Sequence, residues 1–313
     1  MTMRCPITYE PLQYDDKKYS KKGLELLSRN LRRLKDFPYS QQAQKEEAIS
    51  LAGKLSIQGV QPKLSLLLDT KNETFNIAPQ GGLYILKMQS DWPSLPENED
   101  LTMRLAKVVE LEVPLHGLVY CQDQTFSYWI RRFDRPSTRQ KLPLEDFAQL
   151  LSHTRETKYE ASMEEVVEVI NRYTSFPVLE KEKLFLLTLF NFLVGNEDMH
   201  LKNFSLLRVG HKISLSPCYD LLNTTLALGK AVKEELALPL QGKKNKLRAE
   251  DLVDYFGRGR LGLMDKRINY YLDLLRNAQE AWLSLISMSF LTSDQKEAYV
   301  ELVSARAQRL FNV

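Results

Sequence analysis

The feature that most constrains this chain is an apolar run followed at once by a loop of polar side chains. Residues 183–194 are apolar on nearly all sides, which is typical of a helix buried in a core. Gly195 and Asn196 tolerate the left-handed conformation that ends a helix. Residues 197–203 are therefore predicted to form a loop that leaves a rigid helix, and such a loop can hold side chains in reproducible positions.

The residues after this loop are predicted to form a β-hairpin. Its strands are expected over 204–207 and 213–216, and Pro217 ends the pairing because it lacks a backbone donor. The hairpin would bring Asp220 back toward Asn203.

Asp198, Asn203 and Asp220 follow the order of polar groups that kinases use. In kinases one carboxylate accepts the proton of an incoming hydroxyl group, while an amide and a second carboxylate hold Mg²⁺ on the phosphates of ATP. The spacing Asp-x4-Asn is common, and aspartates in loops often only cap or turn the chain. The loop, the hairpin and the second aspartate together favour the catalytic interpretation.

A lysine on an apolar strand supplies the other half of this pattern. Residues 83–88 are predicted to form a strand that carries Lys87, where a kinase has the lysine that contacts the ATP phosphates. A helix is expected to start near Glu97 and to run to Val109, with Glu99 in its first turn as the partner of Lys87. The alternatives are a solvated lysine and acidic residues that only complement the helix dipole.

Residues 55–68 stand where kinases carry a phosphate-covering loop, and a strand is expected from Leu64 to Leu68. The segment contains Gly59, but neither Gly-x-Gly-x-x-Gly nor a Walker motif is present. Close approach of the backbone to a phosphate is therefore possible at one point. The candidate ATP-binding residues of this loop are Ser56, Ile57, Gln58, Gly59 and Val60.

The composition is that of a globular chain without a strong charge bias. The 313 residues are 43% hydrophobic and carry a net charge of +3, which is too small to argue for nucleic-acid binding. The three cysteines are scattered without a Cys-x-x-Cys pair, so neither a zinc site nor a disulfide framework is indicated. Because there is no apolar run of about 18 residues and no signal-peptide pattern, we expect a cytoplasmic protein that does not interact with membranes.

The order of predicted elements gives an α+β fold with two lobes. Residues 1–50 are expected to form an amino-terminal helical extension packed on the N-lobe, with a leucine-rich helical pattern over 24–34. A strand-rich N-lobe over 51–134 and a helical C-lobe over 135–313 follow. The last strands of the N-lobe are expected over 113–119 and 126–130, and further helices over 143–151, 164–173, 264–286 and 294–310.

A basic segment at 241–248 lies where a kinase keeps its activation or substrate loop. The simpler interpretation is a solvated loop. The functional alternative is a docking patch for an acidic partner or for a substrate bound to tRNA.

These motifs, in this order, resemble those of the HipA-like serine/threonine kinases of bacterial toxin–antitoxin systems. The most specific stretch is Asp-x-His-x-Lys-Asn-Phe-Ser at 198–205, and the other matches are 56–63, 98–99, 132–135, 145–147, 158–160 and 217–220. The length of the chain resembles the shorter HipT branch of the tripartite HipBST systems, where the amino-terminal subdomain of HipA is a separate small protein.

The resemblance implies a two-lobed protein-kinase-like fold with ATP and Mg²⁺ as cofactors. It makes Asp198 the catalytic aspartate and Lys87 the phosphate-binding lysine. It makes Asn203 and Asp220 the metal ligands. The hinge that holds adenine is then formed by Arg131, Arg132 and Phe133, and the ATP-binding set is completed by Glu99, His200, Asn203 and Asp220.

His200 and Lys202 lie inside the catalytic loop, and the resemblance counts both as catalytic. In the functional interpretation, Lys202 neutralises charge on the phosphate during transfer. The alternative is that both residues only support the structure of the loop.

Ser56 matches the serine that is autophosphorylated in this family, which pushes the loop outward and switches the kinase off. A phosphate there would add about two negative charges beside the ATP phosphates. Some HipT-like proteins carry a second serine two residues later, where this chain has Gln58, so its regulation can differ. Without the resemblance, a serine in a loop is most often a turn residue.

The expected function is that of a non-specific serine/threonine protein kinase acting as a toxin. It would phosphorylate a cytoplasmic protein, such as an aminoacyl-tRNA synthetase, and so inhibit translation and growth. The implied partners are a small HipS-like protein and a DNA-binding HipB-like protein, with no direct contact to DNA. The alternatives are a kinase for a small molecule or lipid, and a catalytically silent co-repressor in an antitoxin complex.

Overall fold

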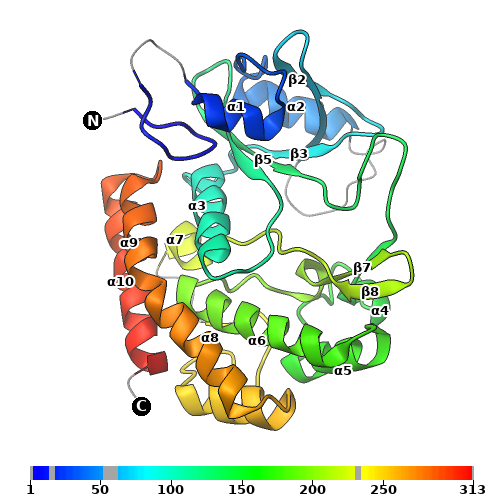
Figure 1. Cartoon of the computed structure of the whole chain (residues 1–313), viewed down its shortest axis with the longest axis vertical. Coiled ribbons are helices and arrows are strands. Elements are labelled where there is room, and N and C mark those ends of the chain that lie inside the picture. Colours follow the sequence, from blue (N-terminus) through cyan, green and yellow to red (C-terminus); the bar gives the residue numbers. More distant parts are fainter. Residues whose placement is uncertain (1–2, 14–17, 52–62, 230–233, 312–313) are drawn as a thin grey trace. The chain divides into compact units, whose positions relative to one another are not determined.

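The computed structural model describes residues 3–13, 18–51, 63–229 and 234–311, and its contacts divide the chain into two units (Figure 1). Unit 1 comprises Met1–Asp100 and Pro114–Lys141, and unit 2 comprises Leu101–Val113 and Leu142–Val313. The boundary falls inside helix α3 (Leu95–Val108). The division of the chain into an extension and two lobes at residues 50 and 134 stays a prediction.

A five-stranded antiparallel sheet forms the centre of unit 1, with its strands in the spatial order β2-β1-β3-β5-β4. The strands are β1 (Lys63–Asp69), β2 (Thr74–Ile77), β3 (Tyr84–Lys87), β4 (His116–Tyr120) and β5 (Phe126–Arg131). Four of them confirm the strands predicted from the sequence within three residues at either end. The four-residue strand β2 was not predicted.

The first fifty residues contribute to the same core as this sheet. They contain α1 (Lys21–Leu27) and α2 (Gln41–Leu51). Leu24, Leu31 and Leu34 are buried in one apolar cluster with Leu64 and Trp129 of the sheet. The helix predicted over 24–34 is wrong in its second half, because α1 ends at Leu27 and the later leucines reach the core from irregular chain.

Unit 2 is mainly helical and contains a sheet with the strand order β6-β7-β8. The strands are β6 (Leu144–Asp146), β7 (Ser205–Val209) and β8 (Lys212–Leu215). The helices are α4 (Phe147–Leu150), α5 (Met163–Tyr173), α6 (Pro177–Val194), α7 (Thr224–Leu228), a π-helix (Glu250–Arg260), α8 (Asp265–Asn277), α9 (Gln279–Met288) and α10 (Ser293–Phe311).

Helix α6 is the core helix of unit 2, and every residue from Leu184 to Val194 is buried. Gly195 ends it in the left-handed conformation at φ 69°, as predicted. The left-handed backbone favours glycine here, and a Cβ atom would in addition force the side chain of Leu302 in α10 to shift. The predicted hairpin is confirmed in β7 and β8.

The helix predicted over 143–151 is wrong in its first part. Residues Leu144–Asp146 form β6, which pairs with β7, and the helix α4 begins only at Phe147. Asp146 is the N-cap, and it exchanges hydrogen bonds with Gln149 in a capping box. The acidic residues therefore precede the helix instead of forming its first turn.

The long helix predicted over 264–286 is interrupted at Ala278, which separates α8 from α9. Beyond the break Trp282 is fully buried, and its Nε1 donates a 3.0 Å hydrogen bond to the carbonyl oxygen of Leu105 in α3. Neither glycine nor proline is present at the joint, so the break is not due to a helix-breaking residue.

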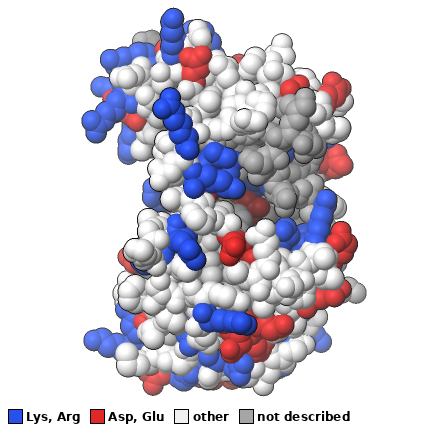
Figure 2. All heavy atoms as spheres, turned by 90° about the vertical axis from the view of Figure 1, so that its right-hand side faces the viewer, with Lys and Arg blue, Asp and Glu red and all other residues white. Residues whose placement is uncertain are grey.

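The surface seen in Figure 2 carries lysine and arginine interspersed with aspartate and glutamate, in keeping with the small net charge of +3. Within the described ranges, no helix combines the length and the apolar character that a membrane crossing requires.

Candidate active site

The polar loop after α6 is fixed by hydrogen bonds to its own backbone and to the end of α6. Asn196 is fully buried, donates to Asn191 Oδ1 at 3.0 Å and accepts from the backbone N–H of Asp198 at 3.2 Å. Asn203 Nδ2 donates to the carbonyl oxygen of Asp198 at 2.8 Å. Because the NH₂ group of Asn203 is used in this way, its amide oxygen is the atom left for a ligand.

Glu197 anchors the same loop to a distant part of unit 2. Its carboxylate accepts hydrogen bonds of 2.7 Å from Thr224 and from Thr225 of α7, and its backbone N–H donates to Thr224 Oγ1 at 2.8 Å. Arg306 of α10 lies 3.5 Å away. Burial raises the pKa of Glu197. The chain that follows Asp220 is thereby tied to the residue that precedes Asp198.

The carboxylate of Asp198 is accessible, with 40% of its side chain exposed. The hydroxyl group of Tyr159 donates a hydrogen bond to Asp198 Oδ1, and His200 Nε2 lies 3.8 Å from the same oxygen. The predicted base thus has a fixed backbone and a carboxylate that is open to solvent.

His200 is buried beneath this surface, and Lys158 Nζ lies 2.7 Å from its Nε2. An ammonium group can only donate, so Nε2 is the acceptor and the ring is neutral. Burial lowers the pKa of His200, and the charge of Lys158 lowers it further. The other nitrogen, Nδ1, is buried and has no hydrogen-bond partner in the described part of the chain.

Lys202 points to a different partner. Its Nζ lies 2.8 Å from Oδ2 of Asp146, the N-cap of α4. This contact supports the structural interpretation of Lys202. A role of Lys202 in phosphoryl transfer stays a prediction.

Asp220 follows the hairpin and has a φ of 55°, a left-handed conformation that is uncommon outside glycine and often marks functional sites. The neighbouring Tyr219 hydroxyl donates to the carbonyl oxygen of Lys202 at 3.0 Å and lies 2.5 Å from Ser205 Oγ. These contacts flank Asn203 on both sides, so the segments that carry the two predicted metal ligands are held together.

The donor set suits Mg²⁺. Within the described residues no group of three His, Cys, Asp or Glu side chains could hold a metal ion. One amide and one carboxylate are nevertheless what Mg²⁺ uses in phosphoryl-transfer enzymes, where phosphates and water supply the other ligands. The predicted ligands Asn203 and Asp220 are one amide and one carboxylate, so their chemistry fits this ion.

Lys87 and Glu99 meet in unit 1, as the sequence predicts. Lys87 Nζ lies 2.5 Å from Glu99 Oε1, and the side chains are 6% and 4% exposed. Glu99 lies in the second turn of α3, because the helix starts at Leu95 instead of near Glu97. Glu97 is separate from this pair, and burial raises its pKa to about 7.

The predicted hinge residues make contacts within unit 1. Arg132 donates two hydrogen bonds to Asp134, from Nε at 2.9 Å and from Nη2 at 2.7 Å. The backbone N–H groups of Arg131 and Arg132 donate to the carbonyl oxygens of Leu115 and Leu83, both at 2.8 Å. Because these two N–H groups are occupied, a contact to adenine would use other groups of this segment, which includes the half-buried Phe133.

The candidates Ser56, Ile57, Gln58, Gly59 and Val60, together with the predicted autophosphorylation at Ser56, lie outside the described residues.

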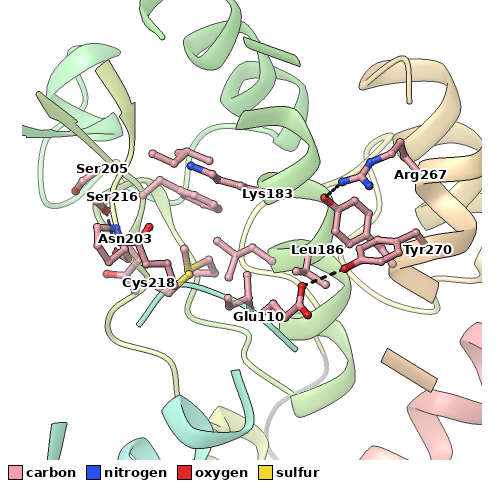
Figure 3. Close-up of a pocket in the computed structure, with 17 residues that line it drawn as sticks. Glu110, Lys183, Leu186, Asn203, Ser205, Ser216, Cys218, Arg267 and Tyr270 are labelled. Atoms are coloured by element: carbon pink, nitrogen blue, oxygen red, sulfur yellow. Dashed lines mark hydrogen bonds between the residues drawn. The ribbon is translucent and has the colours of Figure 1, made fainter. Parts of the chain in front are cut away.

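A pocket of about 290 Å³ lies beside Asn203 in unit 2. Figure 3 shows Asn203, Ser205 and Cys218 on one side of it, with Arg267 and Tyr270 on the other. Its volume is at the lower end of the range of ligand pockets. Burial raises the pKa of the Cys218 thiol to about 12, so this group is protonated at neutral pH.

Three residues near the proposed base were not assigned a role from the sequence, namely Glu197, Lys158 and Tyr159. Lys158 and Tyr159 stand in a motif that matches the HipA-like kinases, which was the one available signal. The contacts of Glu197 depend on residues 27 to 109 positions away, and no local pattern indicates them.

Comparison with known sequences identifies the family. Residues 55–282 match the HipA-like C-terminal domain. A protein of Haemophilus influenzae named "Putative kinase" is 30% identical over 270 residues, which cover 77% of this chain and 74% of that protein. The serine/threonine-protein kinase toxin HipA of Shewanella oneidensis is 31% identical over 192 residues, which cover 55% of this chain and less than half (44%) of the toxin.

The fold is also that of a solved structure. HipA in the complex of HipA, HipB and operator DNA from Shewanella oneidensis superposes with a TM-score of 0.71 at 24% identity, over 90% of this chain and 73% of that one. The α+β arrangement expected from the sequence is therefore the HipA-like, kinase-like fold. On the domain match and the identity to its relatives, this chain belongs to the family of HipA-like C-terminal domains.

Proposed function

We propose that this chain is an ATP-dependent serine/threonine protein kinase that uses Mg²⁺. The observation that carries the proposal is the accessible carboxylate of Asp198 on a loop whose other polar groups are fixed by hydrogen bonds. The buried pair of Lys87 and Glu99 supports it, because kinases orient the phosphate-binding lysine with a glutamate on a helix. The name of the related HipA toxin supports it as well.

In the proposed reaction the oxygen of the acceptor hydroxyl attacks the γ-phosphorus of ATP, and Asp198 accepts the proton of that hydroxyl. The bond between the γ-phosphorus and the β-phosphate oxygen breaks, and ADP leaves. Lys87 contacts the phosphates, and Glu99 orients it. Asn203 and Asp220 would hold Mg²⁺, which neutralises charge on the phosphate oxygens when bound. Nδ1 of His200, which is buried and has no hydrogen-bond partner in the described part of the chain, would be the donor that this residue offers to ATP.

The finer proposal is a toxin of the HipT branch. Its substrate would be a cytoplasmic protein such as an aminoacyl-tRNA synthetase, and its partners HipS-like and HipB-like proteins. The structural likeness to HipA in a complex with HipB and operator DNA supports an antitoxin partner, and a co-repressor role in such a complex is compatible with kinase activity. Autophosphorylation at Ser56 is proposed as the means of inactivation.

Intact-mass spectrometry of the phosphatase-treated chain before and after Mg-ATP tests the proposal. We expect the wild type to gain one phosphate, and Asp198→Asn and Ser56→Ala to gain none. Asp273→Asn, an aspartate of α8 with 63% of its side chain exposed, is the matched control and should behave as the wild type does. A wild type that neither gains phosphate nor turns over ATP contradicts the proposed activity. Phosphate gain that survives Ser56→Ala contradicts only the assignment of the site.

A further inference from the structure

Tyr159 makes with Asp198 the contact that a phosphate acceptor would make. Its hydroxyl group donates a hydrogen bond to Asp198 Oδ1. A catalytic base of a kinase receives this same O–H donor from the serine or threonine to be phosphorylated. One carboxylate oxygen of the proposed base is thus already occupied by a hydroxyl group of the chain itself.

The residue beside Tyr159 is firmly held. Lys158 is buried, its Nζ lies 2.7 Å from His200 Nε2, and its carbonyl oxygen accepts a 3.2 Å hydrogen bond from the N–H of Leu201. These contacts fasten the segment between α4 and α5 to the catalytic loop.

The side chain of Tyr159 is more exposed than that of Lys158. It is 39% exposed, its ring packs edge-on against His200 at a centroid distance of 4.9 Å, and the Lys158 ammonium lies 4.9 Å from its ring centroid. A rotation of this side chain into solvent would release Asp198 Oδ1 and leave the two hydrogen bonds of Lys158 in place. The segment therefore combines a fixed anchor with a side chain that can move.

We propose that Tyr159 gates the acceptor position: its hydroxyl group occupies Asp198 until an acceptor hydroxyl displaces it. This inference rests on the proposed function, because it requires Asp198 to be the base. The gate disfavours transfer of phosphate to water. A water molecule makes no further contacts with the protein that would compensate for the lost hydrogen bond between Tyr159 and Asp198. A protein acceptor makes contacts around its hydroxyl that do offset it.

The test uses the full chain with Mg-ATP and water as the acceptor, measured as ATP hydrolysis. Tyr159→Phe keeps the ring and removes the hydroxyl group. Since a hydrogen bond to a charged group contributes of the order of tenfold to hundredfold to an equilibrium, we expect hydrolysis to rise about 5- to 50-fold with the KM for ATP unchanged. Asp198→Asn in the same background should abolish the rise.

Tyr255→Phe is the matched control, because the Tyr255 hydroxyl also donates to a carboxylate of unit 2, Glu164, at 2.8 Å. It should leave hydrolysis unchanged.

If the wild type hydrolyses ATP and Tyr159→Phe leaves the rate unchanged or lowers it, the gate is wrong and the proposed function stands. If neither protein hydrolyses ATP while the wild type gains phosphate from Mg-ATP, the gate is wrong. If the wild type also gains no phosphate, the proposed function fails and the gate fails with it. Phosphate found on Tyr159 by peptide mass spectrometry after Mg-ATP would make it an acceptor, which also overturns the gate.

Discussion

The charges of the proposed reaction are held in opposite ways in the two units. In unit 1, Lys87 and Glu99 are almost fully buried and lie 2.5 Å apart. In unit 2, Asp198 has 40% of its side chain exposed, and its hydrogen-bond partner Tyr159 is exposed as well. A group that orients a ligand gains from burial beside its partner, whereas a group that exchanges a proton with a substrate must be reachable.

This difference predicts different consequences for mutation. Removing one member of a buried ion pair leaves a charge in a poorly solvated place, so stability falls along with activity. Replacing an exposed carboxylate leaves nothing unpaired in the core, so activity falls alone.

The largest effect is expected for Asp198→Asn, which keeps the shape and removes the base. Phosphoryl transfer should fall about 10²- to 10⁴-fold, because that is the contribution of a general base. The free energy of unfolding should change by less than about 0.5 kcal/mol. Transfer kinetics and urea unfolding measure the two quantities, with Asp273→Asn as the control. A large loss of stability in Asp198→Asn would show that this carboxylate supports the fold, and it would contradict the difference that we describe between the two units.

Lys87→Met should destabilise the fold by about 3–5 kcal/mol, because Glu99 would stay charged and buried without this lysine. The double variant Lys87→Met/Glu99→Gln should recover most of that stability and none of the activity. Urea unfolding of the two variants measures the effect. If the single variant is as stable as the wild type, the pair is not the buried structural element that we describe.

Glu97 should make the stability depend on pH. Burial raises its pKa from 4.5 to about 7 in the folded chain. Between these values the folded state keeps a proton that the unfolded state releases, so the stability that this group contributes is fully present below pH 4.5 and is lost as the pH rises through 7. The loss from this group is about 3 kcal/mol. The free energies of unfolding of the wild type and Glu97→Gln, obtained from thermal melts between pH 4.5 and 8, should diverge by this amount as the pH rises, and the variant should be the more stable protein. Parallel curves would show that Glu97 ionises normally.

Glu197→Gln should have the smallest effect, a loss of about 1–2 kcal/mol in the free energy of unfolding. The amide keeps one acceptor for the threonines of α7 and loses the charge opposite Arg306. Glu234→Gln is the control, since Glu234 has 50% of its side chain exposed. Because Glu197 adjoins Asp198, transfer should also slow in Glu197→Gln. An unchanged rate would show that this anchor does not position the base.

The elements with strong local patterns could be predicted from the sequence. The apolar run before Gly195 predicted α6 and its end, and the hairpin followed from alternating short strands and Pro217. The contact of Lys87 with Glu99 followed from a strand, a loop and a helix in succession.

The elements that depend on distant partners could not be predicted. Strand β6 is three residues long, and it exists because β7, some sixty residues later, offers it a partner. The break at Ala278 is followed by the burial of Trp282 against α3, a long-range contact that no local pattern indicates. Tyr159 meets Asp198 across 39 positions of sequence, so only the fold brings them together.

The most direct test of the central claim is a double-mutant cycle of transfer rates between the two units. The rates of the wild type, Lys87→Met, Asp198→Asn and the double variant are compared at a temperature where all four are folded. If Lys87 and Asp198 act as a unit in phosphoryl transfer, the double variant should be no slower than the slower single variant, because groups that act as a unit are strongly non-additive. Rate losses that multiply would show that the two residues act independently and would contradict the claim that they act as a unit.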